Sequence, residues 1–114
     1  MRTNLVSWQW HGYPANHVTR SNLVLHLITV PMFIAGLAAM FASPLIGAIG
    51  LAGAGAMVIA LVAQGRGHGG EPTAPVPFTG PGDFASRFLV EQLVNFPRFV
   101  VSGGWRRAWA AARR

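Results

Sequence analysis

Two apolar segments, residues 23–42 and 44–64, fill the middle of the 114-residue chain, and neither contains Asp, Glu, Lys or Arg. A helix needs about 20 apolar residues to cross the hydrocarbon core of a bilayer, and each segment has that length. Because the junction between them, around Ala42-Ser43-Pro44, is so short, two such helices must lie antiparallel, side by side. Ser43 suits an N-cap, with Pro44 at the first position of the second helix. We therefore expect an all-α membrane protein built around a transmembrane helical hairpin with two spans.

The composition agrees with a membrane location. Apolar residues make up 52% of the chain and charged residues only 11%, whereas soluble domains carry about 25% charged residues. Cysteine is absent, which excludes disulfides and thiolate metal sites. The main candidates for site chemistry are therefore the four histidines, His11, His17, His26 and His68.

Polar segments lie on both sides of the hairpin. Residues 1–22 contain Trp8, Trp10 and Tyr13. Because Trp and Tyr favour the headgroup level of a bilayer, we expect these residues to form an interfacial arm. Residues 65–82 are so rich in glycine and proline that we expect an irregular loop, which carries His68.

The C-terminal third of the chain predicts two further interfacial elements. Residues 83–97 have the pattern of an amphipathic helix, with Asp83 as its N-cap and Pro97 at its end. This helix is too short to span, so we expect it to lie along the membrane surface or to cap the hairpin. Residues 98–114 form a basic tail with two tryptophans one turn apart, which is typical of an anchor on an anionic leaflet.

The distribution of charge predicts the orientation of the hairpin. Arg2 and Arg20 precede the first span, the other seven arginines follow the second, and the connector has none. The positive-inside rule then places both termini in the cytoplasm. A membrane role accounts for the basic tail, so we expect no nucleic-acid partner.

Small residues dominate part of the second span. Gly and Ala alternate through much of residues 47–56, and small residues allow helices in lipid to approach closely. We expect this face to pack either against the first span or against a second subunit in a homodimer.

The hairpin also predicts which polar side chains meet. His26 lies one turn inside the first span and His68 lies just beyond the second. Because two antiparallel spans of equal length return the chain to the same side of the membrane, both histidines belong to one interface. His17 and Glu71 fall at that interface too.

The position of His17 depends on where the first helix begins. Asn22 and His26 are four residues apart and share one face of a helix. His17 would lie on the opposite face of a continuous helix, so it joins the site only if the helix begins after it. Thr19 or Ser21 as the N-cap would meet that condition.

Several neutral imidazoles near a carboxylate suit Fe(II), Zn, Cu or Ni. Asn22 or Glu71 could fix the tautomer of a ligating ring. Two other interpretations remain open at this stage. The hairpin could be a non-catalytic scaffold that binds a partner through its Gly/Ala face, with His26 hydrogen-bonded inside the helix pair. Alternatively, two histidines could hold a haem.

The same residues show a family resemblance. His17-x4-Asn22-x3-His26 with Pro31, followed by Gly67-His68 and Glu71, resembles the membrane-bound 2-hydroxy fatty acid dioxygenases of phytosphingosine α-oxidation. The segments PVPFTGPGDF, RFLVEQ and FPRFVVSGGW are similar to the C-terminal part of a largely uncharacterised bacterial branch. Members of that family generally have more apolar spans than the two in this chain.

The resemblance implies an Fe(II)-dependent dioxygenase that uses O2 to shorten a 2-hydroxy fatty acid by one carbon, in the inner membrane of a bacterium. It implies His17, His26 and His68 as metal ligands. Asn22 and Glu71 match accompanying motif positions and are the candidate catalytic residues. Because Arg pairs well with planar anions, Arg20 or Arg66 is the candidate for binding the substrate carboxylate.

Overall fold

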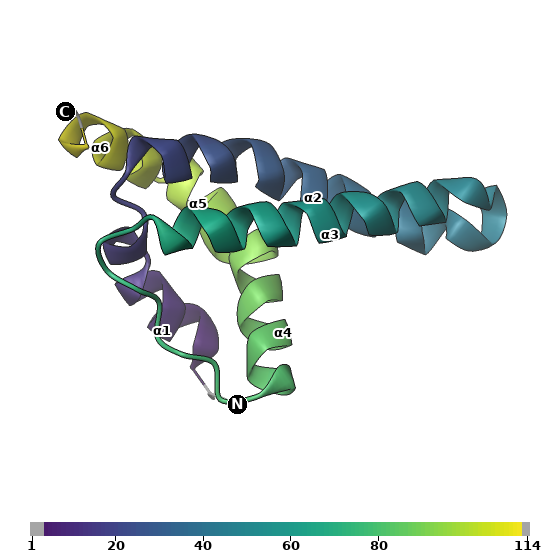
Figure 1. Cartoon of the computed structure of the whole chain (residues 1–114), viewed down its shortest axis with the longest axis horizontal. Coiled ribbons are helices and arrows are strands. Elements are labelled where there is room, and N and C mark those ends of the chain that lie inside the picture. The colour runs from purple at the N-terminus through teal and green to yellow at the C-terminus, as the bar shows by residue number, and fades with distance from the viewer. Residues whose placement is uncertain (1–3, 113–114) are drawn as a thin grey trace.

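The two apolar segments form a helical hairpin, which is the longest feature of the molecule (Figure 1). The computed structural model describes residues 4–112, except for the side chains of residues 43–46. The hairpin consists of α2 (Arg20–Ile46) and α3 (Ala48–Gly69). Both helices are long and apolar enough to cross a membrane. The expected all-α fold with two candidate spans is therefore confirmed.

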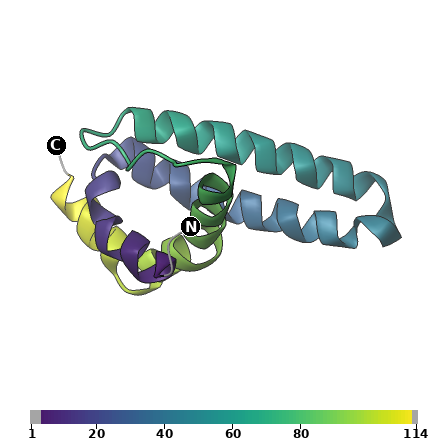
Figure 2. The same cartoon turned by 90° about the horizontal axis from the view of Figure 1, so that it is seen from below.

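Shorter helices gather around the end of the hairpin that lies away from its turn, hereafter the open end (Figure 1, Figure 2). The helical turn η1 (Pro14–Asn16) follows α1 (Leu5–Gly12) and leads into α2. After α3, an extended strap, residues 71–80, leads to α4. The remaining helices are α4 (Pro81–Val90), the π-helical turn η2 (Glu91–Asn95), α5 (Phe96–Val101) and α6 (Gly104–Ala111).

The two long helices pack in direct backbone contact. A Cβ atom on Gly53 would lie 2.5 Å from the carbonyl oxygen of Gly36, and one on Gly36 would lie 2.6 Å from that of Gly53. Only glycine on both helices permits this distance. Of the two expected partners for the Gly/Ala face, the first span is therefore the one that covers Gly53. Gly55 has open space around it.

The turn of the hairpin differs from the sequence prediction. The connector was expected at Ala42-Ser43-Pro44 with Ser43 as N-cap, but α2 continues to Ile46 and the turn falls at Gly47. Gly47 has φ +65°, a backbone conformation that L side chains rarely adopt. The need for a residue that tolerates positive φ therefore places the turn at Gly47.

The helix α3 extends further than the sequence suggests. Residues 65–69 were expected to start the loop, but they form the last turns of α3 and carry His68. A Cβ atom at Gly67 would collide with the Asn22 side chain and with Leu25. The gain from close packing on α2 thus outweighs the poor helix propensity of glycine at this position.

The predicted amphipathic helix is longer than expected and changes its geometry midway. It is capped by Gly80, while Asp83 lies in the first turn and accepts hydrogen bonds from Thr79 N at 3.1 Å and from Arg87 Nη1 at 3.2 Å. Pro97 does not end the helical path. It stands in the first turn of α5, where its missing N–H costs little.

The basic tail folds back onto the start of α2. Trp105 Nε1 donates to the carbonyl oxygen of Leu23 at 3.0 Å, and Trp105 stacks on Trp109. The guanidinium of Arg20 lies over the ring of Trp109 at 4.1 Å. The apolar core at the open end consists of Tyr13, Leu23, Val30, Phe96 and Phe99.

Candidate metal centre

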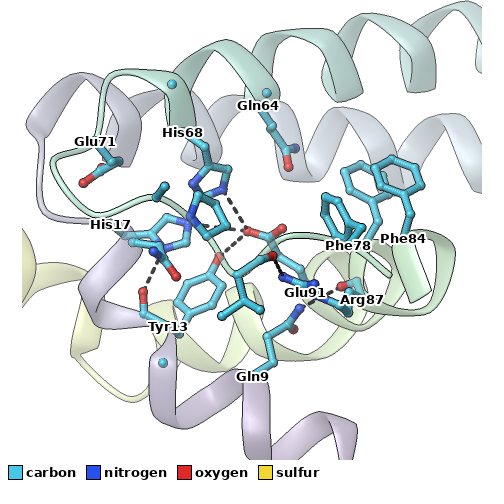
Figure 3. Close-up of a pocket in the computed structure, with 18 of the residues that line it drawn as sticks. Gln9, Tyr13, His17, Gln64, His68, Glu71, Phe78, Phe84, Arg87 and Glu91 are labelled. Atoms are coloured by element: carbon cyan, nitrogen blue, oxygen red, sulfur yellow. Dashed lines mark hydrogen bonds and ion pairs between the residues drawn. The ribbon is translucent and has the colours of Figure 1, made fainter. Parts of the chain in front are cut away.

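Three histidines and one glutamate converge at the open end of the hairpin; His17, His68 and Glu91 are labelled in Figure 3. His17 precedes α2, His26 lies in α2, His68 lies in the last turn of α3, and Glu91 begins η2. Their ligand atoms all lie within 4.8 Å of one another. We call these four residues the His3Glu cluster.

The carboxylate oxygen Oε2 of Glu91 lies at the centre of the His3Glu cluster. It is 3.4 Å from His17 Nε2, 3.3 Å from His26 Nε2 and 3.8 Å from His68 Nε2. Ligand atoms that share one first-row metal ion at about 2.1 Å lie about 3.0–3.4 Å apart. The separations in the cluster are therefore close to those of a metal coordination shell.

Hydrogen bonds fix the tautomer of two of the rings. His17 Nδ1 lies 2.9 Å from the carbonyl oxygen of Tyr13, and His26 Nδ1 lies 3.1 Å from that of Asn22. Because a carbonyl oxygen only accepts, each Nδ1 carries the proton and donates it. In a neutral ring, Nε2 then presents a bare lone pair.

These lone pairs leave an electrostatic problem that a cation would solve. The Nε2 atoms of His17 and His26 are buried and have no hydrogen-bond partner. They face a carboxylate oxygen, so lone pairs oppose lone pairs across little more than 3.3 Å. Burial lowers the pKa of His17 below its usual value despite the neighbouring Glu91, which favours the neutral ring. Neutral imidazoles and a carboxylate around one point form a donor set for a metal ion.

Tyr13 supports this arrangement. Its ring stacks on His17 with centroids 4.0 Å apart, and its hydroxyl donates to Glu91 Oε2 at 2.9 Å. Burial and the adjacent Glu91 carboxylate raise the pKa of Tyr13 well above its usual value, so the hydroxyl keeps its proton. Burial alone would raise the pKa of Glu91, but the three surrounding histidines outweigh burial and hold it well below its usual range. Glu91 is therefore ionised.

Asn22 and Glu71 lie beside the cluster but are not members of it. Glu71 accepts hydrogen bonds from Val18 N at 2.9 Å, from Thr19 N at 3.2 Å and from Asn22 Nδ2 at 2.9 Å. Burial opposes its ionisation, but these bonds outweigh that effect and lower its pKa below the usual value. Glu71 thus holds the residues at the N-terminus of α2, and the carbonyl of Asn22 orients His26.

The first long helix begins after His17, which is what His17 needs in order to join the site. The helix α2 begins at Arg20, and Thr19 Oγ1 accepts from Asn22 N at 3.3 Å, as an N-cap side chain does. His17 lies before this cap, in non-helical backbone with φ −138°. Its side chain can therefore point toward His26 instead of following the opposite face of α2.

Arg20, Arg66 and His11 lie outside the cluster. Arg20 donates to the carbonyl oxygen of Trp109 at 3.3 Å and stacks on that ring, and Arg66 is exposed. Neither arginine lines the pocket beside the cluster. His11 lines the pocket but is exposed, and its Nδ1 bonds the carbonyl oxygen of Ser7 at 2.7 Å.

A pocket of about 710 Å³ opens beside the cluster (Figure 3). His17, His68 and Glu91 form one part of its wall. Most of the remaining wall is apolar, and its larger apolar side chains are Trp8, Leu61, Val76, Phe78, Phe84 and Phe88. The pocket can therefore take a ligand that has one polar end and an apolar body.

Two hydrogen-bond networks shape this pocket. Gln64 and Gln92 exchange amide hydrogen bonds of 3.0 and 2.7 Å, which ties α3 to η2 next to Glu91. Arg87 donates to the carbonyl oxygens of Val76 at 2.7 Å and Pro77 at 3.2 Å, which ties the strap to α4. The strap is thereby held along one side of the pocket.

Glu91 is the member that the sequence interpretation missed. The helical pattern of residues 83–97 groups Glu91 with Arg87 and Asn95 on one face at i, i+4 spacing and assigns it no role in a site. The available signal was its rarity, because the chain has only three acidic residues. In the structure its side chain is 12% exposed, and the π-helical turn that it begins lies against the histidines.

No family model, curated protein or solved structure matches this chain. The function is therefore inferred from the site itself.

Proposed function

We propose that the protein is a membrane-bound, Fe(II)-dependent dioxygenase that shortens 2-hydroxy fatty acids by one carbon. The observation that carries the proposal is the His3Glu cluster, with two ring tautomers fixed by backbone carbonyls, beside a largely apolar pocket. The sequence resemblance supplies the reaction type, and the donor set is compatible with it.

The four side chains suit iron chemically. Three imidazole nitrogens and one carboxylate oxygen are ligands that Fe(II) accepts, so His17, His26, His68 and Glu91 would hold the ion. When bound, the iron would supply the activation of O2. The chain's own residues orient the ligands: Tyr13 and Asn22 fix the rings of His17 and His26 through their backbone carbonyls.

The pocket suits an amphipathic substrate. The hydroxyl and carboxylate of a 2-hydroxy acid would lie at the His3Glu cluster, and the acyl chain would lie against the aromatic wall. The reaction balances with O2 as the only oxidant. The 2-hydroxy acid and O2 give the acid one carbon shorter, CO2 and water, with the bond between C1 and C2 broken.

The location belongs to the same proposal. The two candidate spans and the arginine distribution support the inner membrane of a bacterium, with both termini in the cytoplasm. The open end with the cluster would then lie at the cytoplasmic face. Within the Gly/Ala face, residues 47–56, Gly55 stays uncovered in the single chain, so a homodimer would use this side of α3.

Metal analysis of the full chain, purified without a His tag under reducing conditions, tests the metal. We expect about one iron per chain in the wild type and its loss in Glu91→Gln and His26→Ala. His11→Ala is the matched control, because His11 lines the pocket but lies outside the cluster. Metal-free wild-type protein after iron is supplied would overturn the proposal, and a Soret band would favour the haem interpretation.

A turnover assay tests the reaction. The iron-loaded wild type, supplied with O2 and 2-hydroxypalmitate in lipid, should release the acid that is one carbon shorter. Glu91→Gln should be inactive, whereas His11→Ala should retain activity. If iron-loaded protein gave no such product, the dioxygenase assignment would be overturned, whereas the metal site would stand.

A further inference from the structure

The surface of the protein carries only one sign of side-chain charge within the described residues. The chain has three acidic side chains, and all are turned inward: Asp83 is 6% exposed, Glu71 is 8% exposed and the side chain of Glu91 is 12% exposed. Arg66, Arg98, Arg106 and Arg107 are exposed. Such a surface attracts anions and offers no carboxylate to neutralise the guanidinium groups.

A second cavity, with Arg107 in its wall, lies at the open end of the hairpin. It has a volume of about 480 Å³ and is separate from the pocket beside the His3Glu cluster. Its wall is formed by the N-terminal segment on one side and by α5 and α6 on the other. The lining residues are Trp10, Pro14, Val18, Phe99, Gly104, Arg107, Ala108, Ala111 and Ala112. We call this cavity the α6 groove.

The α6 groove is apolar with cations at its edge. Arg107 is the one charged residue of its lining, and its Nη1 has a single long hydrogen bond, 3.4 Å to the carbonyl oxygen of Ser102. Arg98 stacks over Trp10 at 4.1 Å, so a second guanidinium lies against a residue of the same wall. The groove thus combines an apolar slot with two exposed cations.

We infer that the α6 groove binds one anionic phospholipid, with its phosphate at Arg107 and part of an acyl chain along the groove. A phospholipid matches both features, because its headgroup is negative and its chains are apolar. The helices that contribute to the wall of the groove, α1, α5 and α6, lie at the open end of the hairpin (Figure 2), where the two candidate spans would leave the membrane. An acidic peptide or a nucleic acid would match the charge but would leave the apolar slot unfilled.

This inference rests on the membrane placement proposed above and is independent of the metal. Native mass spectrometry of the full chain, released from nanodiscs with equal phosphatidylglycerol and phosphatidylcholine, tests it. We expect one retained phosphatidylglycerol per chain. Arg107→Gln should lower its occupancy about 5-fold, the effect of one cation near an anionic surface. Arg106→Gln is the matched control, because Arg106 is an exposed neighbour outside the groove.

A second pair of variants separates the contribution of the apolar groove to lipid binding from that of the arginine charge. Ala111→Phe fills the groove and keeps every arginine, whereas Ala110→Phe adds the same ring at an exposed position outside it. We expect only Ala111→Phe to displace the lipid. Equal retention of the two lipids, or equal effects within either pair of variants, would overturn the inference. Failure of the wild type to enter nanodiscs would instead overturn the membrane placement, and with it the basis of the lipid site.

Discussion

Tyr13 contacts two of the four cluster residues in three different ways. Its carbonyl accepts from His17 Nδ1, its ring stacks on His17, and its hydroxyl donates to Glu91. It is 3% exposed, so these contacts are shielded from water. Partners of this kind orient metal ligands, and their loss typically lowers metal affinity about 10–100-fold.

Tyr13→Phe should therefore weaken metal binding while the stacked ring stays in place. We expect a loss of affinity of about 10–100-fold for Co(II), together with a changed visible absorption spectrum of the Co(II)-loaded protein. Thr29→Val is the matched control, because it also removes one buried hydroxyl, whose bond to the carbonyl oxygen of Leu25 is 2.8 Å long. Equal effects of the two variants would show that Tyr13 acts only through general stability.

The sequence predicts the histidines better than the carboxylate. The hairpin argument places His17, His26 and His68 at one interface, because it needs only helix length and antiparallel return. Glu71 is the carboxylate closest to them in sequence, but it holds the N-terminus of α2. Glu91 belongs to a helix whose docking depends on long-range packing and a π-helical turn, which a periodic pattern does not reveal.

Glu71 gives the stability of this region a defined pH dependence. Its folded-state pKa lies below the usual value, so its ionised form stabilises the fold above pH 4.5 and this contribution is lost as the pH falls through the lower folded-state pKa. Glu71→Gln should lower the free energy of unfolding by about 1–3 kcal/mol at pH 7. Denaturant unfolding at several pH values should show this difference shrink toward acid. A difference that does not change with pH would contradict the assignment.

At the scale of elements, backbone contact between α2 and α3 determines how the hairpin packs. A Cβ atom at Gly53 would lie 2.5 Å from Gly36 O and 2.8 Å from Ala39 Cβ, so the two helices would have to separate. Helix propensity alone would predict that replacing Gly53 with Ala stabilises the protein, since Ala is the better helix former.

Gly53→Ala should thus destabilise the protein by about 1–3 kcal/mol through overpacking. Gly55→Ala is the matched control, since its Cβ atom would meet nothing within 4 Å. Unfolding in detergent micelles measures both variants, and the control should be neutral or slightly stabilising. An unchanged free energy of unfolding in Gly53→Ala would show that the two helices can separate at this contact without cost.

Element boundaries were the least predictable part of the fold. Glycine-rich residues 65–69 remain helical because Gly67 packs against Asn22, and the turn falls at Gly47 because of its positive φ. Pro97 continues a helical path because it occupies a first-turn position. In each case a tertiary or conformational requirement outweighs local propensity, which a linear reading of the sequence cannot detect.

At the scale of the whole molecule, the sequence predicts the architecture well, because two charge-free segments with a short connector permit few arrangements. The hairpin carries apolar side chains on its outer surface, including Phe41 at 80% and Leu51 at 81% exposure. Water would be a poor solvent for these faces, whereas lipid would cover them.

Single cysteines can test the proposed orientation directly, because the chain has none of its own. Ala48→Cys lies beside the hairpin turn and Ala110→Cys lies in α6, and both positions are exposed. A membrane-impermeant maleimide should label Ala48→Cys in intact spheroplasts and Ala110→Cys only after lysis. The reverse pattern would place the termini on the outer side.

The His3Glu cluster joins residues that are far apart in the chain, from His17 to Glu91. A bound ion would therefore act as a cross-link. It would join the segment before α2, α2 itself, the end of α3 and η2. Any ion that binds only the folded form adds stability that increases with the free ion concentration. The amount of folded protein in the cell would then depend on the supply of that metal ion, whichever metal the cluster holds.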